Sequence, residues 1–531
     1  MPNQPQHFVG IDVGTGSARA GVFTADGLML ASAKHDIAIY FEAGEIVEQS
    51  SNDVWAAVCA SVRQAVEQSG IDPSSVRGIG FDATCSLVVV GEGGRPLAVG
   101  PSEDPERNII VWMDHRALEQ ADRITRTGHE VLRFVGGVLS PEMETPKLLW
   151  LKENRPAIFG EANHFFDLAD YLTWRATGST ARSSCTVTCK WTYLAHEHRW
   201  DESFFRQIGL GKLADEGFAR IGTDIVQPGT HIGGLKPDAA AGMGLEVNTP
   251  VAAGLIDAHA GGIGTVGAIG SPDENMAYVF GTSSCTMTTT SEPAFVPGVW
   301  GPYFSAMMPG LWLNEGGQSA AGAAIDRLVS LHPAYRETTQ KAAAEGLSLL
   351  AYLSSSAVQQ SRTASDAIRL ANGLQVVPEF LGNRAPFADP NSRAVIAGLG
   401  MDQSEASLLA LYIAGLSGIG YGLRQIISAQ AKHGAPVCRI IISGGAGQDD
   451  LVRQMLADTT GLPIVVTESE EPVLLGAAIL GAVASGLYST LQDAMAKMTR
   501  ARRVLEPALG EIVDLQNSRF VKFERLQSAA R

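Results

Sequence analysis

Two short stretches of the chain carry the same arrangement of glycine, threonine and serine. Residues 8–23 and 277–290 each lead from an apolar or β-branched strand into a Gly-Thr-x-Ser turn and back into another strand. The turns at Gly14-Thr15 and Gly281-Thr282-Ser283 lie about half a chain apart, which predicts two related halves. Glycine at such a turn permits positive φ, and backbone N–H groups with hydroxyls would line an anion-binding nest. Both turns are therefore candidates for holding phosphate.

An ordinary β-hairpin would also explain either turn taken alone, because hairpin turns are rich in Gly and Ser. Asp12 favours the phosphate interpretation. It lies at the first turn, where a carboxylate would be needed beside a phosphate that carries Mg²⁺.

Asp257 is the candidate general base. It follows an apolar stretch that starts at Val251 and precedes a run of small residues, which predicts a strand handing over to a helix. Ligands of α/β sheets bind at the carboxyl ends of the strands, so a carboxylate there would face a ligand. A helix N-cap explains the local sequence at least as well.

Residues 443–450, SGGAGQDD, place glycines between an apolar strand and a helix, where a backbone could approach a nucleotide. A tight strand-to-helix turn is the alternative. Gly262, Gly264 and Gly267 match the spacing of a dinucleotide fingerprint, but they lie on the helix predicted after Asp257 and lack the acidic partner about 20 residues on. Neither a P-loop nor a GxSxG motif is present in the sequence.

The elements that must position these residues alternate between strand and helix, which predicts α/β sheets. At 531 residues the chain exceeds one hydrophobic core, and we place two domains at 1–262 and 263–531. Besides the turns, the patterns predict a helix from Asn52 to Gly70, strands at 78–90 and 109–114, an irregular segment at 180–229 covering a cleft, and a helix at 404–430.

The composition excludes several kinds of partner. A net charge of −16 argues against nucleic acid and anionic membranes. The N-terminus has neither a basic segment nor a long apolar one, so we expect a soluble, cytoplasmic enzyme. Cys185 and Cys189 lie four residues apart, but no CxxC motif or His cluster in the sequence completes a zinc site, and we expect no structural metal.

Six separated motifs, in order, resemble those of the FGGY carbohydrate kinases. They are GIDVGTGSAR, PKLLWLKENRP, GLIDAHAGGIG, FGTSSCTM, GNRAPFADPNSRAVIAGL and ISGGAGQDDLVRQMLADTTGLPI. The resemblance covers nearly the whole chain. It implies two RNase H-like domains, as in actin and Hsp70, flanking a central cleft that binds ATP and Mg²⁺. It also implies ATP-dependent phosphorylation of a sugar hydroxyl.

Carried over position by position, the resemblance assigns Asp257 as catalytic base and Asp12 with Asp257 as the metal-associated carboxylates. The implied nucleotide and phosphate contacts are Gly14, Thr15, Gly281, Thr282, Ser283, Gln318, Gly444, Gly445, Ala446 and Asp449. The implied sugar contacts are Thr84, Cys85, Trp112, Asp114, Arg116, Lys190, Asp257 and Glu315. Two positions depart from the family pattern: Asp449, where many relatives have Asn or Ser, and Glu144, where a small or hydroxyl residue is usual.

The sugar-side motifs resemble two branches of the family. Residues 84–88 and 112–117 look like the D-ribulokinases, whereas Lys190 and Glu315 match residues that reach the sugar in L-ribulokinases. The expected substrate is a ketopentose, D-ribulose first, with L-ribulose and ribitol as alternatives. An actin- or Hsp70-like ATPase without a sugar is the alternative from another class. We expect a homodimer only because it is the commonest assembly of soluble oligomeric proteins.

Overall fold

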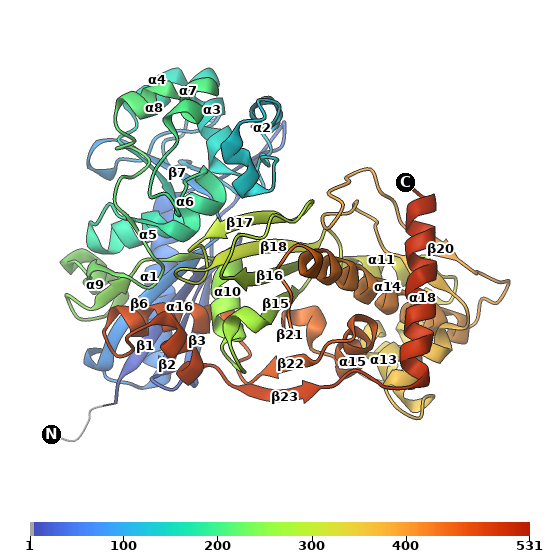
Figure 1. The fold of residues 1–531 in the computed structure, drawn as a ribbon. Helices are drawn as coiled ribbons and strands as arrows, with labels where there is room; N and C mark the ends of the chain where they lie inside the picture. Colours follow the sequence, from blue (N-terminus) through green and yellow to red (C-terminus); the bar gives the residue numbers. More distant parts are fainter. Residues whose placement is uncertain (1–4) are drawn as a thin grey trace.

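The computed structural model describes residues 5–531, which are built around two seven-stranded sheets with helices on their faces (Figure 1). The first sheet has the strand order β12-β13-β6-β1-β2-β3, with β14 also paired to β6. Its strands are β1 (His7–Val13), β2 (Ser17–Thr24), β3 (Met29–Asp36), β6 (Val76–Ala83), β12 (His231–Gly234), β13 (Pro250–Ala252) and β14 (Leu255–Ile256). The apolar side chains of its central strands and of α1 (Ser51–Ser69) form one buried core.

The second sheet has the strand order β17-β18-β16-β15-β21-β22-β23. Its strands are β15 (Asn275–Phe280), β16 (Ser284–Thr290), β17 (Trp300–Phe304), β18 (Trp312–Gln318), β21 (Arg439–Ser443), β22 (Ile464–Thr467) and β23 (Ala501–Leu505). A separate core lies between this sheet, α14 (Glu405–Lys432) and α15 (Asp450–Thr460).

The two sheets repeat one plan. In each, a central strand pairs antiparallel with the strand that follows it and parallel with a later one: β1 with β2 and β6, and β15 with β16 and β21. The two Gly-Thr turns join β1 to β2 and β15 to β16. The predicted repeat of two related halves is therefore present in the strand order itself.

Two helices cross between the halves. α10 (Asp257–Val266) belongs to the first half in sequence but packs against β15, β16 and β21 of the second sheet. α16 (Pro472–Ala484) comes from the second half and packs against β1, β6 and α10 (Figure 1, where α16 lies beside the blue strands).

Glycines make this crossing possible. A Cβ atom on Gly476 of α16 would lie 1.9 Å from the Ala260 carbonyl oxygen, and one on Gly264 would lie 1.9 Å from that of Pro472. Gly264 and Gly262 lie inside α10 and Gly267 caps its C-terminus, so the apparent dinucleotide fingerprint is helix packing. That interpretation of the sequence is confirmed.

A smaller sheet and a group of helices extend the first half. The sheet has the order β4-β5-β8-β7-β9, formed by β4 (Tyr40–Glu42), β5 (Ile46–Gln49), β7 (Leu87–Val90), β8 (Ile109–Ile110) and β9 (His164–Asp167). The strand predicted at 109–114 was too long, because the chain turns after Ile110. The irregular segment predicted at 180–229 was wrong in part, since it contains the entirely buried helix α6 (Ser184–Trp191).

α14 is long and apolar enough to cross a membrane by length and composition. Most of its apolar stretch, 83%, is buried inside the protein, where it packs against α15 and α11 (Gly322–Ser330). It is therefore a core helix of the second half.

Candidate active site

Three aspartates meet where β1, β6 and β14 end. Asp12 of β1 and Asp82 of β6 are direct partners in the parallel register, and Asp82 is also the partner of Leu255, two residues before Asp257. Arg19 of β2 pairs with the Asp12 carboxylate and extends to Glu471, 2.8 Å away. The register alone thus gathers carboxylates at one edge of the sheet.

Asp82 is the member of this group that the sequence did not reveal. Its side chain is fully buried, and neither carboxylate oxygen has a hydrogen-bond donor within the described residues. Burial, and then the neighbouring charge of Asp12, raise the pKa of Asp82 well above its ordinary value. The available signal was its place as the first polar residue after an apolar run in a predicted strand.

Asp257 is the first residue of α10, and the N-cap is Ile256. The N-cap alternative for Asp257 is therefore wrong. Its carboxylate accepts a hydrogen bond from the Ala258 N–H at 2.7 Å and remains partly accessible. Burial, followed by the charge of Asp12, raises the pKa of Asp257 to about 6. A carboxylate that is ionised at neutral pH and yet more basic than usual suits a general base.

The two Gly-Thr turns have similar backbone bonds. The Gly14 N–H donates to the Ser17 carbonyl at 3.0 Å, and the Gly281 N–H donates to the Ser283 carbonyl at 3.0 Å. Neither glycine has positive φ, so that expected reason for glycine was wrong. A Cβ on either would meet no protein atom closer than 3.7 Å, so the glycines leave the outer side of each turn open.

Thr15 of the first turn is tied to the predicted sugar side. The Trp112 indole N–H donates to the Thr15 hydroxyl at 2.9 Å, and the Trp112 backbone N–H donates to Ser86 at 3.1 Å. Thr84 lies 3.3 Å from the same Ser86 hydroxyl, and its backbone N–H donates to Val13 at 3.0 Å. These bonds place Trp112 and Thr84 beside the first Gly-Thr turn.

Lys190 and Glu315 approach each other from different halves, at the end of α6 and on β18. Lys190 Nζ lies 5.7 Å from the centre of the Trp300 ring. Burial acts to lower the pKa of Lys190, but Cys85 and Glu315 outweigh it and hold the pKa well above its ordinary value. The pKa of Glu315 lies below its ordinary value, because the attraction of His259 and Lys190 exceeds the effect of burial. A buried cation and a buried anion thus lie within electrostatic range of each other, and Cys85 is within range of the cation.

His259 was not predicted to belong to this site. It lies on α10, two residues after Asp257, and its Nε2 is 3.0 Å from Glu315 Oε1. No local pattern could predict this contact, because Glu315 lies 56 residues further along the chain.

Asp114 and Arg116 are occupied by other protein groups. The Asp114 carboxylate accepts from the Val47 N–H at 2.6 Å and from the Arg116 guanidinium at 2.7 and 2.8 Å. Arg116 also donates to Glu48 and to the Val99 carbonyl, both at 2.9 Å, and its side chain is only 2% exposed. This buried network holds β5 against the loop after β8, so we leave both residues out of the proposed sugar contacts.

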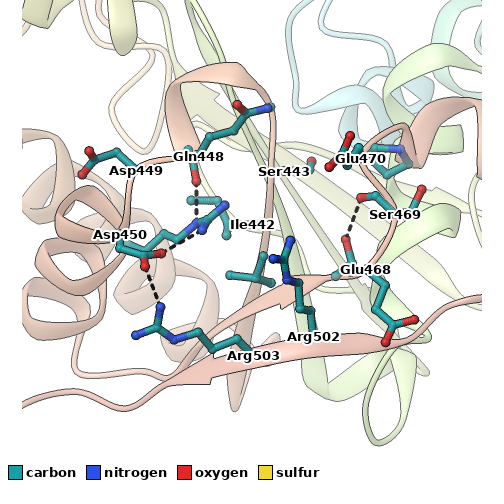
Figure 2. A pocket seen from close by; sticks show the side chains of 16 residues that line it. Ile442, Ser443, Gln448, Asp449, Asp450, Glu468, Ser469, Glu470, Arg502 and Arg503 are labelled. Atoms are coloured by element: carbon teal, nitrogen blue, oxygen red, sulfur yellow. Dashed lines mark hydrogen bonds and ion pairs between the residues drawn. The ribbon is translucent and has the colours of Figure 1, made fainter. Parts of the chain in front are cut away.

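The predicted nucleotide loop borders a cavity of about 700 Å³ (Figure 2). Gly444, Asp449, Arg453, Arg502 and Arg503 are among its lining residues. Gly444 has φ +91°, and a Cβ there would lie 2.5 Å from the Phe280 carbonyl, so this position does require glycine.

Three other predicted nucleotide contacts differ in how many protein groups they already contact. Gly445 has open space around its Cα. Asp449 is the N-cap of α15, accepting from the Val452 N–H at 3.1 Å and from the Ser354 hydroxyl at 2.8 Å. Gln318 donates to the Ile419 carbonyl at 3.1 Å and accepts from Ser284 at 3.3 Å, so it braces the second turn.

Comparison with known proteins decides what kind of protein this is. The N-terminal domain of the FGGY family of carbohydrate kinases matches residues 7–264, and the C-terminal domain of that family matches residues 276–485. The chain belongs to the FGGY family of carbohydrate kinases.

Curated relatives match this FGGY kinase over most of their length. The human FGGY carbohydrate kinase domain-containing protein is 46% identical over 516 residues, covering 95% of this chain and 93% of the relative. The D-ribulokinase of Saccharomyces cerevisiae is 40% identical over 524 residues, covering 91% and 73%. A ribulokinase of Mycolicibacterium smegmatis is 30% identical over 527 residues, covering 94% and 89%.

Solved structures support the fold. A xylulose kinase from Rhodospirillum rubrum aligns with a TM-score of 0.81 at 18% identity, covering 99% of each chain. A glycerol kinase from Plasmodium falciparum, solved with ADP, aligns at 0.79 and 16% identity, covering 98% of each. The predicted α/β fold of two RNase H-like domains is confirmed for this FGGY kinase, and ATP is the phosphate donor of its family.

Proposed function

We propose that this FGGY kinase transfers the γ-phosphoryl group of ATP to the terminal primary hydroxyl of a ketopentose, with D-ribulose as the preferred substrate. The observation that carries the proposal is Asp257 beside Asp12 at the first Gly-Thr turn, with the buried Lys190 within electrostatic range of both Asp257 and Glu315. A base with a pKa of about 6 therefore has a buried cation and anion near it that could hold sugar hydroxyls. The likeness to the yeast D-ribulokinase favours D-ribulose over other ketopentoses.

In the proposed reaction the Asp257 carboxylate accepts the proton of the sugar hydroxyl as the hydroxyl oxygen attacks the γ-phosphorus. The oxygen–phosphorus bond forms as the bond to the leaving ADP oxygen breaks. Positioning and charge neutralisation account for most of the acceleration in phosphoryl transfer. Lys190, Glu315, Thr84, Cys85 and Trp112 are the proposed sugar-side residues. The turns at Gly14-Thr15 and Gly281-Thr282-Ser283 would donate N–H groups to the phosphates.

The residues present fit a magnesium ion. Mg²⁺ takes oxygen ligands, usually one or two carboxylates together with phosphate oxygens and water. Asp12 would hold the ion, with Asp257 associated with it, and the buried Asp82, whose oxygens have no hydrogen-bond partner within residues 5–531, places a further carboxyl group nearby. When bound, the ion would neutralise charge on the transferred phosphoryl group.

Gly444, Gly445, Ala446 and Asp449 are the proposed contacts on the nucleotide side, with Gln318 holding the second turn in place. Domains 1–262 and 263–531, a cytoplasmic location and a homodimer remain part of the proposal.

A coupled assay of ADP release tests the substrate. We expect the highest kcat/KM with D-ribulose among D-ribulose, L-ribulose, ribitol, D-xylulose and glycerol, and little ADP release without sugar. A higher kcat/KM for L-ribulose or ribitol would reassign the substrate within the family. ADP release that no sugar changes would instead support an actin- or Hsp70-like ATPase.

The variant Asp257→Asn tests the base. We expect kcat to fall about 10²- to 10⁴-fold, the usual contribution of a general base, with ATP affinity little changed. The matched control is Asp238→Asn, an exposed aspartate on α9 (Pro237–Met243). Near-normal turnover by Asp257→Asn would remove Asp257 from this role.

A further inference from the structure

Four side chains with metal-binding chemistry meet in a cluster that includes Glu315, one of the proposed sugar-side residues. Cys185 and Cys189 come from α6, His259 from α10 and Glu315 from β18. The two cysteines and the histidine are fully buried, and Glu315 is 7% exposed. Residues four apart share one face of a helix, so the spacing of the cysteines aims both sulfurs at the same neighbours.

The distances within this cluster are short. His259 Nδ1 lies 3.0 Å from Cys185 Sγ, and His259 Nε2 lies 3.0 Å from Glu315 Oε1. Cys189 Sγ, a ring nitrogen of His259 and a carboxylate oxygen of Glu315 all lie within 4.8 Å of one another. In a tetrahedral zinc site such ligand atoms lie about 3–4 Å apart, so shifts of about 1 Å would bring them into place.

The histidine is oriented as metal-binding histidines usually are. In such sites one ring nitrogen binds the metal, and the other is held by a second protein group that fixes the tautomer and the direction of the ring. Here Cys185 holds Nδ1, which leaves Nε2 directed toward Glu315. Once Cys189 and His259 give up their protons to bind a cation, one thiolate, one imidazole and one carboxylate form a ligand set suited to zinc rather than to magnesium.

We propose that Cys189, His259 and Glu315 form a binding site for a borderline divalent cation, Zn²⁺ being the type, with Cys185 orienting the histidine. Three protein ligands leave a fourth position for water. The cysteine spacing alone had suggested no metal, because the histidine and the carboxylate come from distant segments. Folding brings His259 and Glu315 next to Cys189.

One consequence rests on the proposed function. Glu315 is a proposed sugar contact, and a carboxylate that binds the cation is no longer free to accept a hydrogen bond from a sugar hydroxyl. The cation and the ketopentose should therefore exclude each other, and micromolar Zn²⁺ should inhibit the kinase competitively with the sugar and not with ATP.

Titration of the full, tag-free chain with Co²⁺ tests the site directly, because a thiolate bound to Co²⁺ gives intense near-ultraviolet absorption. We expect one Co²⁺ per chain with this absorption, displaced by one equivalent of Zn²⁺ and not by millimolar Mg²⁺. Cys189→Ser should abolish the absorption. Cys59→Ser, in α1 and outside the cluster, is the matched control and should keep it.

Two further variants keep the test decisive if Cys189→Ser does not fold, as judged by circular dichroism. Glu315→Gln should weaken Co²⁺ binding, and Cys185→Ser should weaken it about 10- to 100-fold, as loss of an orienting group usually does. Wild-type protein without stoichiometric thiolate absorption, or folded variants that bind Co²⁺ like wild type, would overturn the proposal.

Addition of D-ribulose separates this site from the proposed function. Displacement of Co²⁺ by the sugar would support mutual exclusion. Absorption that persists at saturating sugar would overturn the exclusion and the sugar role of Glu315, whereas the variants would still establish the cation site.

Discussion

At the scale of single residues, two carboxyl groups with raised pKa values are expected to have different roles. Asp257 and Glu144 are both acids with a raised pKa, and in each case burial is the largest cause. Asp257 is partly accessible and stands at the edge of a sheet, where a substrate can reach it. Glu144 is fully buried, and neither of its carboxylate oxygens has a hydrogen-bond donor within residues 5–531. The raised pKa of Asp257 should therefore appear in the pH dependence of the reaction rate. The raised pKa of Glu144 should appear in the pH dependence of stability.

The rate should report the titration of Asp257. A base must be ionised to accept a proton, and its pKa of about 6 lies above the ordinary 3.8. The value of kcat/KM for MgATP, which reports the enzyme form that MgATP binds, should fall as pH drops through about 6, to about a tenth of its plateau at pH 5. Direct measurement of ADP between pH 4.5 and 8 checks this. An acidic limb centred near 4 would contradict it.

Stability should report the titration of Glu144. Its pKa of about 7 in the folded protein exceeds the ordinary 4.5, so its contribution to stability is fully present below 4.5 and is lost as pH rises through 7. Glu144→Gln removes this dependence. Between pH 5 and pH 8 the free energy of unfolding in urea should fall more in wild type than in the variant. Parallel pH dependences would refute the assignment.

At the scale of elements, the close packing of α10 against α16 requires glycines, because a Cβ atom at these positions would collide with the backbone of the other helix. Gly476→Ala would put a methyl group where the Ala260 carbonyl oxygen lies, so the helices would have to separate. We expect a loss of about 1–3 kcal/mol in urea unfolding, the usual cost of overpacking. Gly160→Ala in α4 (Pro156–Glu161) is the control, because its Cβ would meet no atom within 4 Å. That variant should be neutral or more stable by up to about 1 kcal/mol. Equal effects would show that packing is not the reason for Gly476.

Elements with a local signal could be predicted from the sequence. The helix starting near Asn52 is present as α1, capped by Ser50 and ended by Gly70 at φ +68°, and the helix at 404–430 is present as α14. α6 escaped prediction because all of its residues are buried, so its sequence shows no alternation of polar and apolar faces.

Site residues followed the same rule. Asp257 could be found because strand and helix signals meet at it. Asp82 and His259 could not, because their importance comes from neighbours that only the folded chain supplies: Asp12 across β1 and β6, and Glu315 on β18. Asp114 and Arg116 show the opposite situation: their residue types suit a sugar, their side chains bind each other in the structure, and the predicted sugar contact stays a prediction.

At the scale of the whole molecule, each half covers part of the other. Leu474 and Ile479 of α16 and Ala260 and Ile263 of α10 are completely or almost completely buried in one hydrophobic cluster. Residues 1–268 produced alone would leave the face of β1 and β6 without α16, and residues 269–531 would lack α10. We expect neither piece to unfold cooperatively by itself, and the two to form a 1:1 complex when co-expressed. A cooperative thermal transition of either isolated piece would contradict this.

The crossing of α10 and α16 also bears on how such a chain could arise. A shorter polypeptide with only one of the two repeated sheets would have a helix with no sheet to pack against and a sheet face that no helix covers. Two copies could bury these exposed surfaces by exchanging helices, as domain-swapped dimers do. The crossed packing of α10 and α16 is the arrangement expected of such a dimer fused end to end. Fusion would then have let the copies diverge, one keeping the proposed base on its exchanged helix and the other the glycines against which that helix packs.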